Sequence, residues 1–169
     1  MRRAWLALLA VLGVALSAAA ETEVRTGDTF PSLVGVECDR GSPPATEGRV
    51  VLVDFWASWC APCKASFPAY AKLQADYAAR GLLIVAVSVD EDADAYGAFV
   101  KRFNPTFLTV RDKSKQLVSQ VKVPAMPTCY LVGCDGKVRF RHEGFHGADT
   151  ERELRQEIDS LLNEKSNSP

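Results

Sequence analysis

The sequence lacks an excess of charge of either sign. Its 20 lysines and arginines are balanced by 21 aspartates and glutamates, which gives a formal net charge of −1. Binding to a nucleic acid depends on a surplus of basic residues that neutralise phosphates, so we expect no nucleic-acid partner. Hydrophobic residues make up 47% of the chain and charged residues 24%, which is typical of a soluble globular domain.

Histidine is scarce, with two residues, and the five cysteines include a single CxxC pair. A structural metal site usually needs a second CxxC pair or histidines at a matched spacing. The other candidate ligands do not repeat such a spacing: Cys129, Cys134, His142 and His146. We interpret the two histidines as surface residues, because they fall on a predicted strand and turn, and we expect neither a metal nor a cofactor.

A long hydrophobic run occurs at the N-terminus, where Arg2 and Arg3 precede 17 uncharged residues, Ala4–Ala20. A membrane span needs about 20 apolar residues, so this run is marginal for one. A basic start, an apolar middle and small closing residues are typical of a cleaved secretory signal. We therefore predict a signal peptide over residues 1–20 and a periplasmic protein, with an uncleaved membrane anchor as the alternative.

After the signal, one domain is expected over residues 21–163, followed by a disordered tail, 164–169. Glycine, proline and acidic residues are frequent in residues 21–48. An apolar run, Leu33–Val36, predicts a strand of an N-terminal β-hairpin whose turn falls at Asp39–Pro44.

The remaining pattern alternates strands with helices. Strands are predicted over 49–56, 82–89, 106–110, 127–133 and 137–144, and helices over 61–80, 90–103, 113–120 and 151–162. Pro68 falls inside the first of these helices and should kink it. The order predicts an α/β protein with a mixed sheet and helices on both faces.

Cys60 and Cys63 stand where a buried strand ends and a helix begins, in the stretch WASWCAPCK. Unpaired N–H groups and the helix dipole stabilise a thiolate there, so we expect Cys60 to have a low pKa and to be the nucleophile. Cys63, one turn further on, could resolve a mixed disulfide by attacking Cys60. Pro62 suits the first helical turn. A purely structural disulfide is less favoured, because so short a loop gains little stability.

The stretch VDFWASWCAPCK, Val53–Lys64, resembles the active-site segment of the thioredoxin superfamily. Together with the export signal, AVSVDED at Ala86–Asp92 and the later MPTCYLVGCDGKV are similar to the TlpA/ResA-type branch of exported bacterial thioredoxin-like reductases. The resemblance implies a thioredoxin fold with an N-terminal β-hairpin and a central αβ insertion. It also implies a thiol–disulfide oxidoreductase.

Further site residues follow from this resemblance. Met126, Pro127 and Thr128 resemble the loop whose proline is cis in the superfamily and whose backbone pairs with an extended substrate. Trp59, Ala61 and Pro62 would share in substrate binding, and Trp56 with Trp59 would shield the pair. Two positions depart from the family pattern, since Ala125 replaces its usual glycine and Ser66 the glutamate of ResA-like proteins.

Asp54 is the third candidate catalytic residue. A carboxylate inside the apolar run VVLVDFW is costly to bury in its charged form, so its pKa should be raised. It precedes Cys60 by six residues, where thioredoxin keeps a buried acid that assists proton transfer at the second cysteine. We therefore predict a general base for Cys63, and the alternative is a hydrogen-bonded polar group at a strand end.

Three cysteines remain outside the pair. If residues 129–133 are extended, the Cα atoms of Cys129 and Cys134 lie roughly 16 Å apart, whereas a disulfide allows no more than about 7 Å. We therefore expect these two to stay unpaired with each other and Cys129 to be a small buried hydrophobe. Pairing of Cys38 with Cys134 stays open.

The sequence thus predicts an exported, monomeric reductant of protein disulfides, with protein substrates that carry disulfides or thiols. The resemblance implies a role in cytochrome c maturation or copper-site assembly, with electrons from a membrane thiol donor of DsbD or CcdA type. One alternative is a DsbA-like oxidant that introduces disulfides. The other is a non-catalytic binding module or metallochaperone.

Overall fold

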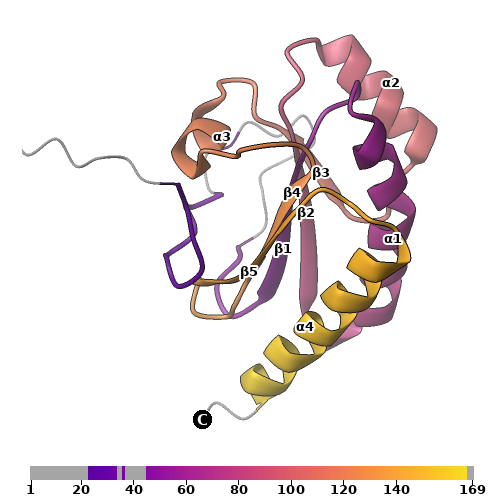
Figure 1. The fold of residues 1–169 in the computed structure, drawn as a ribbon. Helices are drawn as coiled ribbons and strands as arrows, with labels where there is room; N and C mark the ends of the chain where they lie inside the picture. Colours follow the sequence, from indigo (N-terminus) through magenta and orange to yellow (C-terminus); the bar gives the residue numbers. More distant parts are fainter. Residues whose placement is uncertain (1–22, 34–35, 37–44, 167–169) are drawn as a thin grey trace, which may run out of the picture.

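The computed structural model describes residues 23–33, 36 and 45–166 (Figure 1). The predicted signal peptide, Cys38 and the predicted turn at Asp39–Pro44 lie outside these residues. In the described part, no helix combines the length and the apolar character needed to cross a membrane.

The strand predicted over Leu33–Val36 is wrong at both of its described ends. The N–H of Val36 donates to the carbonyl oxygen of Leu33 at 3.4 Å, and neither of these two residues lies in a strand. The N-terminal segment instead pairs earlier in the chain, where Thr29 forms an isolated bridge with Lys137. Pro31, which has no N–H to donate, follows this bridge and disfavours continued pairing.

Ten elements follow in chain order: β1 Val50–Trp56, α1 Ala61–Tyr77, η1 Ala78–Arg80, β2 Leu82–Ser88, α2 Ala93–Phe103, β3 Leu108–Arg111, α3 Gln116–Val121, β4 Thr128–Val132, β5 Val138–Glu143 and α4 Ala148–Ser166. They form a five-stranded sheet in the order β3-β2-β1-β4-β5. β1, β2 and β3 run parallel, whereas β4 is antiparallel to β1 and β5. The predicted thioredoxin fold is confirmed.

β1 is the central strand, and all seven of its residues are buried. A near-continuous apolar run is what a strand covered on both faces requires. Asp54 interrupts that run and lies opposite Cys129 of β4 in the register. The strand leads directly into the CxxC segment, so the sheet fixes the position from which α1 starts.

Helices cover both faces of the sheet, as predicted. Figure 1 shows α1, α2 and α4 on one side, and α3 with the N-terminal segment on the other. Trp56 at the end of β1 packs against Phe67 of α1 and Phe99 of α2, with ring centroids 4.9 and 4.4 Å apart. Such aromatic contacts add to the hydrophobic burial that holds helices on a sheet.

α1 ends close to its predicted boundary. It passes into the short η1, and Gly81 follows in the left-handed region at φ 105°. Glycine adopts this conformation without the steric cost that a Cβ adds. α4 continues to Ser166, past the predicted end at Leu162, so the first residues of the predicted tail are helical.

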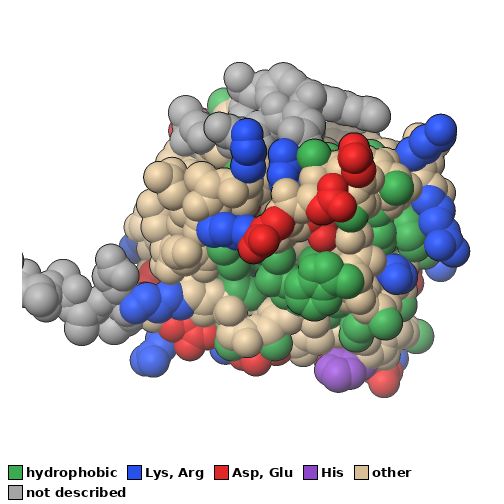
Figure 2. Space-filling model, turned by 90° about the horizontal axis from the view of Figure 1, so that it is seen from above, with side chains coloured by type: hydrophobic (Ala, Val, Ile, Leu, Met, Phe, Trp, Pro, Cys, Tyr) green, Lys and Arg blue, Asp and Glu red, His purple; other side chains and the backbone are tan. Residues whose placement is uncertain are grey.

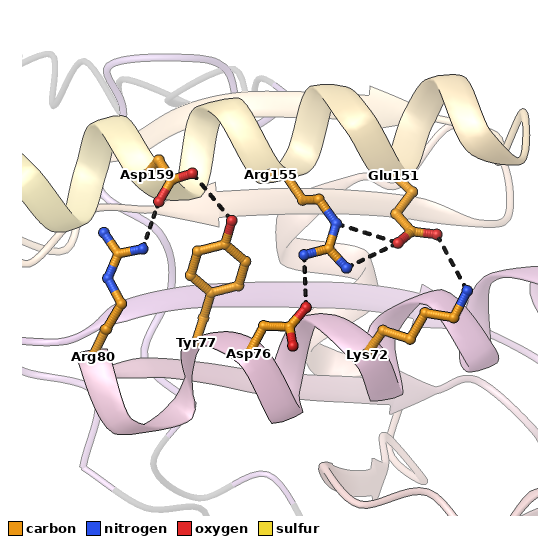
Figure 3. Close-up of polar contacts among 7 residues, drawn as sticks. All are labelled: Lys72, Asp76, Tyr77, Arg80, Glu151, Arg155 and Asp159. Carbon is orange, nitrogen blue, oxygen red and sulfur yellow. Dashed lines mark hydrogen bonds and ion pairs between the residues drawn. The ribbon is translucent and has the colours of Figure 1, made fainter.

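A line of charged and polar side chains joins α1 to α4 (Figure 3). Arg155 of α4 donates to Asp76 of α1 at 2.7 Å and to Glu151 on its own helix at 2.9 Å. One turn away, the Tyr77 hydroxyl donates to Asp159 at 3.1 Å. These partly exposed contacts each add modest stability, and together they fix how α4 lies along the active-site helix.

His142 is not the surface residue that the sequence suggested. Its side chain is 15% exposed, because β5 is covered there by α4, and its Nε2 lies 2.7 Å from Glu157 Oε2. Glu153 Oε2 is 3.7 Å from the other ring nitrogen. The hydrogen bond to Glu157 raises the pKa of His142 in spite of its burial. His142 therefore docks α4 against the sheet.

Replacing His142 by Gln should alter how stability depends on pH. A His pKa that is higher in the folded state stabilises the fold fully below the unfolded value near 6.5, and this contribution is lost as the pH rises through the folded value. We expect the free energy of unfolding of wild type to exceed that of His142→Gln by about 1 kcal/mol near pH 6. This difference should shrink above neutral pH. Urea unfolding at several pH values measures this; an equal difference at all pH values would contradict it.

Candidate active site

The two cysteines of the CxxC motif form a disulfide at the start of α1, with Cα atoms 5.3 Å apart. Cys60 is the N-cap residue, and its Sγ accepts a hydrogen bond from the N–H of Cys63 at 3.2 Å. Cys60 is 5% exposed, whereas Cys63 is fully buried. Cys60 is therefore the sulfur at the surface, held where backbone N–H groups stabilise a thiolate.

A buried carboxylate holds the loop that leads into the disulfide. Asp90, just after β2, accepts hydrogen bonds from the N–H of Ser58 at 3.0 Å and from its hydroxyl at 2.9 Å. Ser88 donates to the same carboxylate at 2.8 Å. Because β1 and β2 are parallel, their carboxyl ends meet at this edge, and Asp90 links the two. Asp90 thereby restrains the segment that presents Trp59 and Cys60.

The face around the disulfide is partly apolar. Figure 2 looks onto the end of the sheet where β1 passes into α1, and hydrophobic side chains gather in its middle beside acidic ones. Trp59 is 70% exposed there and borders a hollow that Glu91, Asp92 and Lys115 also line. Ala61 and Pro62 are exposed as well. A partner protein could therefore contact Trp59 and the two residues between the cysteines directly.

Trp56 does not contribute to this surface, contrary to the expectation from sequence. It is fully buried among the aromatic residues of α1 and α2. As the last residue of β1, its side chain points to the face of the sheet that those helices cover. Trp56 packs under the active-site helix, between it and the sheet. Of the two tryptophans, only Trp59 presents a large apolar surface to the solvent.

The loop before β4 has the predicted conformation. The Met126–Pro127 peptide bond is cis. Thr128 is buried, and its hydroxyl donates to the carbonyl oxygen of Ala125 at 2.8 Å, which closes the loop on itself. Ala125 thus occupies the family's glycine position without disturbing the cis bond. Met126 is half-buried and Pro127 buried, so Met126 is the more accessible of the two to a substrate.

Asp54 is fully buried in β1, as predicted. The Tyr70 hydroxyl of α1 donates to its Oδ1 at 3.0 Å, and Oδ2 has no hydrogen-bond partner among the described residues. Burial raises the pKa of Asp54 well above its ordinary value, and the bond from Tyr70 offsets only part of this. The group can therefore hold a proton at a pH where an exposed aspartate is ionised.

Comparisons with known proteins agree with this geometry. Residues 25–158 match the Redoxin family. The chain belongs to that family. ResA of Geobacillus thermodenitrificans, a thiol–disulfide oxidoreductase, is 31% identical over 161 residues, covering 92% of this chain and 91% of that protein. The resemblance to ResA-type oxidoreductases, which the stretches AVSVDED and MPTCYLVGCDGKV suggested, is confirmed.

Two further relatives extend the comparison of this redoxin. ResA of Oceanobacillus iheyensis is 33% identical over 120 residues, which cover 68% of this chain and 62% of the relative. The crystal structure of a protein described as a thiol:disulfide interchange protein DsbE, from Chlorobium tepidum, has 34% identity and a TM-score of 0.78. The match covers 83% of this chain and 99% of the Chlorobium tepidum chain.

The two described cysteines outside the CxxC motif are not bonded to the pair. Cys129 and Cys134 are both free, the first buried and the second half-buried, so the prediction that they do not bond to each other is confirmed. Among the described residues, no three His, Cys, Asp or Glu side chains come together as a metal site.

Ser66 has a structural contact in place of the family's glutamate. It is fully buried, and its hydroxyl donates to the carbonyl oxygen of Cys63 at 2.9 Å. The acid that contacts the active-site helix from the sheet is Asp54 on β1, through the Tyr70 hydroxyl. The sequence predicted this shift from helix to strand, but it did not reveal Tyr70, whose signal is its position seven residues after Cys63.

Proposed function

We propose that this thiol–disulfide oxidoreductase works as a reductant of protein disulfides. The observation that carries the proposal is the Cys60–Cys63 disulfide at the start of α1, with the more accessible sulfur at the N-cap. In the reduced protein, the Cys60 thiolate attacks a substrate disulfide and forms a mixed disulfide. Cys63 then attacks the Cys60 sulfur, the substrate leaves as a thiol, and the pair ends oxidised.

The residues between the cysteines favour a reductant over an oxidant. A strong oxidant such as DsbA owes its high potential to extra stabilisation of its reduced form. Here the intervening residues are Ala61 and Pro62, neither of which carries a charge or a side-chain donor. Stabilisation of the Cys60 thiolate then comes mainly from the helix start, as at the N–H of Cys63. That modest stabilisation supports a low reduction potential.

The remaining assignments belong to the same proposal. Asp54 takes the proton of Cys63 during resolution, and the loop Met126–Thr128 offers its backbone to an extended substrate segment. The N-terminal signal supports export to the periplasm. Because each turnover oxidises the pair, a membrane thiol donor of DsbD or CcdA type would have to reduce it again, and a monomer suffices for this cycle.

The reduction potential of the Cys60–Cys63 pair tests the direction of electron flow. We expect a value near or below that of thioredoxin, about −270 mV, from equilibration with glutathione or a dithiol buffer and alkylation of the free thiols. A value near that of DsbA, about −120 mV, would instead identify an oxidant. The Cys134→Ser variant, which removes the more accessible of the two described free thiols, should give the same value as wild type.

A further inference from the structure

Asp54 belongs to a buried cluster with Tyr70 and Cys129, here called the Asp54 cluster. The three side chains come from β1, α1 and β4 and are 0%, 1% and 2% exposed. Tyr70 Oη lies 3.0 Å from Asp54 Oδ1. Cys129 lies opposite Asp54 in the pairing of β1 with β4.

The hydrogen bond within the Asp54 cluster has one direction. A tyrosine hydroxyl has a single hydrogen, and Tyr70 gives it to Asp54 Oδ1. Burial raises the pKa of Cys129, so this neighbour is a neutral thiol and adds no charge beside the carboxyl group. Oδ2 has no hydrogen-bond partner among the described residues and is the open oxygen of the carboxyl group.

Tyr70 is also aligned with the resolving cysteine. It follows Cys63 by seven residues on α1, which is about two turns, so both face the sheet from the same side of the helix. Helical side chains tilt towards the N-terminus of their helix, so the Tyr70 hydroxyl reaches back towards the turn of Cys63. The hydroxyl and Asp54 therefore meet beneath the helix that carries Cys63.

We propose that Tyr70 is a positioning residue for proton transfer at Cys63. Tyr70 occupies Oδ1 and leaves Oδ2 to exchange the proton. As the Cys63 sulfur attacks Cys60, its proton passes to Oδ2, and the substrate sulfur leaves with the electron pair of the broken disulfide bond. The bond from Tyr70 also stabilises the carboxylate, so that Asp54 can act as the base. This inference rests on the role proposed for Asp54.

The Tyr70→Phe variant tests it by removing the hydroxyl and little else. Without that donor, Asp54 should keep its proton to higher pH. Insulin-disulfide reduction at neutral pH should then slow about three- to tenfold, through kcat and not KM, and recover in alkaline solution. A ¹³C NMR titration of the Asp54 carboxyl should shift in the same direction. Tyr77→Phe is the matched control, because that α1 hydroxyl bonds to Asp159 on α4 and should leave both profiles unchanged.

Two further variants supply a second, independent measurement. In Asp54→Asn no carboxyl proton is left to position, so adding Tyr70→Phe should slow reduction no further. Tyr70→Leu also removes the hydroxyl and should shift both profiles in the same direction as Tyr70→Phe. If Tyr70→Phe fails to fold, Tyr70→Leu carries the test.

The possible results separate the inference from the proposed function. Unchanged profiles in folded Tyr70→Phe, or in Tyr70→Leu where Tyr70→Phe does not fold, would overturn the inference, as would additive effects of Tyr70→Phe and Asp54→Asn. If wild type does not reduce insulin but its Asp54 titration still depends on Tyr70, the proposed function fails and the Asp54 cluster stands.

Discussion

Replacing Cys60 by Ser should lower the rate of insulin-disulfide reduction by at least about a thousandfold. The bond to the substrate forms at the Cys60 sulfur, and a serine hydroxyl is not ionised at neutral pH and does not attack a disulfide. The fold should persist, because Cys60 caps α1 through one acceptor atom that a serine oxygen can replace. Circular dichroism of the variant verifies this.

Cys63→Ser should give a different result, because it stops the reaction one step later. Cys60 still attacks the substrate, but no thiol is available to release it, so a covalent adduct accumulates. Mass spectrometry should detect this adduct and its loss on adding dithiothreitol. Cys134→Ser controls for thiols outside the pair. An adduct formed by Cys60→Ser and not by Cys63→Ser would reverse the assigned roles.

The contrast between the two variants also distinguishes an enzyme from a binding module. A non-catalytic protein that binds through the face around Trp59 would keep its cellular function after Cys60→Ser, since the substitution leaves that surface intact. Loss of reduction with retained partner binding is the result expected here. It would show that the disulfide chemistry, and not the apolar surface alone, provides the function.

The sequence predicted the parts of the fold that depend on local pattern. A nearly continuous apolar run predicted the central strand β1, and Gly81 predicted the point where α1 and the short η1 after it have ended. The CxxC pair and Met126–Pro127 came from motif resemblance, which carries information about long-range contacts that periodicity does not. The ends of α4 were the least accurately predicted, because it spans Ala148–Ser166 where the pattern indicated 151–162.

The errors concern contacts between distant segments. Trp56 was assigned to the surface because it adjoins the motif, but the helices that bury it are defined only once the chain has folded. His142 alternates with basic residues on an edge strand, and only the position of α4 brings Glu157 to it. Tyr70 illustrates the same limit, since its hydroxyl finds Asp54 from a different element. Side-chain partners across elements are set by packing, which a single sequence does not display.

Replacing Asp54 by Asn should slow disulfide reduction at neutral pH by about a hundredfold. Asparagine has nearly the same shape, but it cannot accept the Cys63 proton. The rate should fall most in the step in which Cys63 attacks the mixed disulfide. The appropriate measurement is therefore the single-turnover decay of a preformed mixed disulfide. Equal decay rates in the variant and wild type would exclude Asp54 as the base. His142→Gln, a substitution on the distant β5–α4 contact, should leave this rate unchanged.

The same Asp54→Asn variant should change how stability depends on pH, and the sign follows from burial. Because the folded-state pKa is raised above the ordinary value of 3.8, the folded protein binds the proton more tightly than the unfolded chain does. The contribution of Asp54 to stability is therefore full below pH 3.8. It declines as the pH rises towards the folded-state pKa. Asparagine cannot ionise, so this decline should be absent from urea unfolding of the oxidised variant. His142 also loses its contribution as the pH rises, but only from about 6.5 upward. A decline that begins in acid and disappears with Asp54→Asn, but persists in His142→Gln, therefore identifies Asp54 as the buried group that must be charged for catalysis.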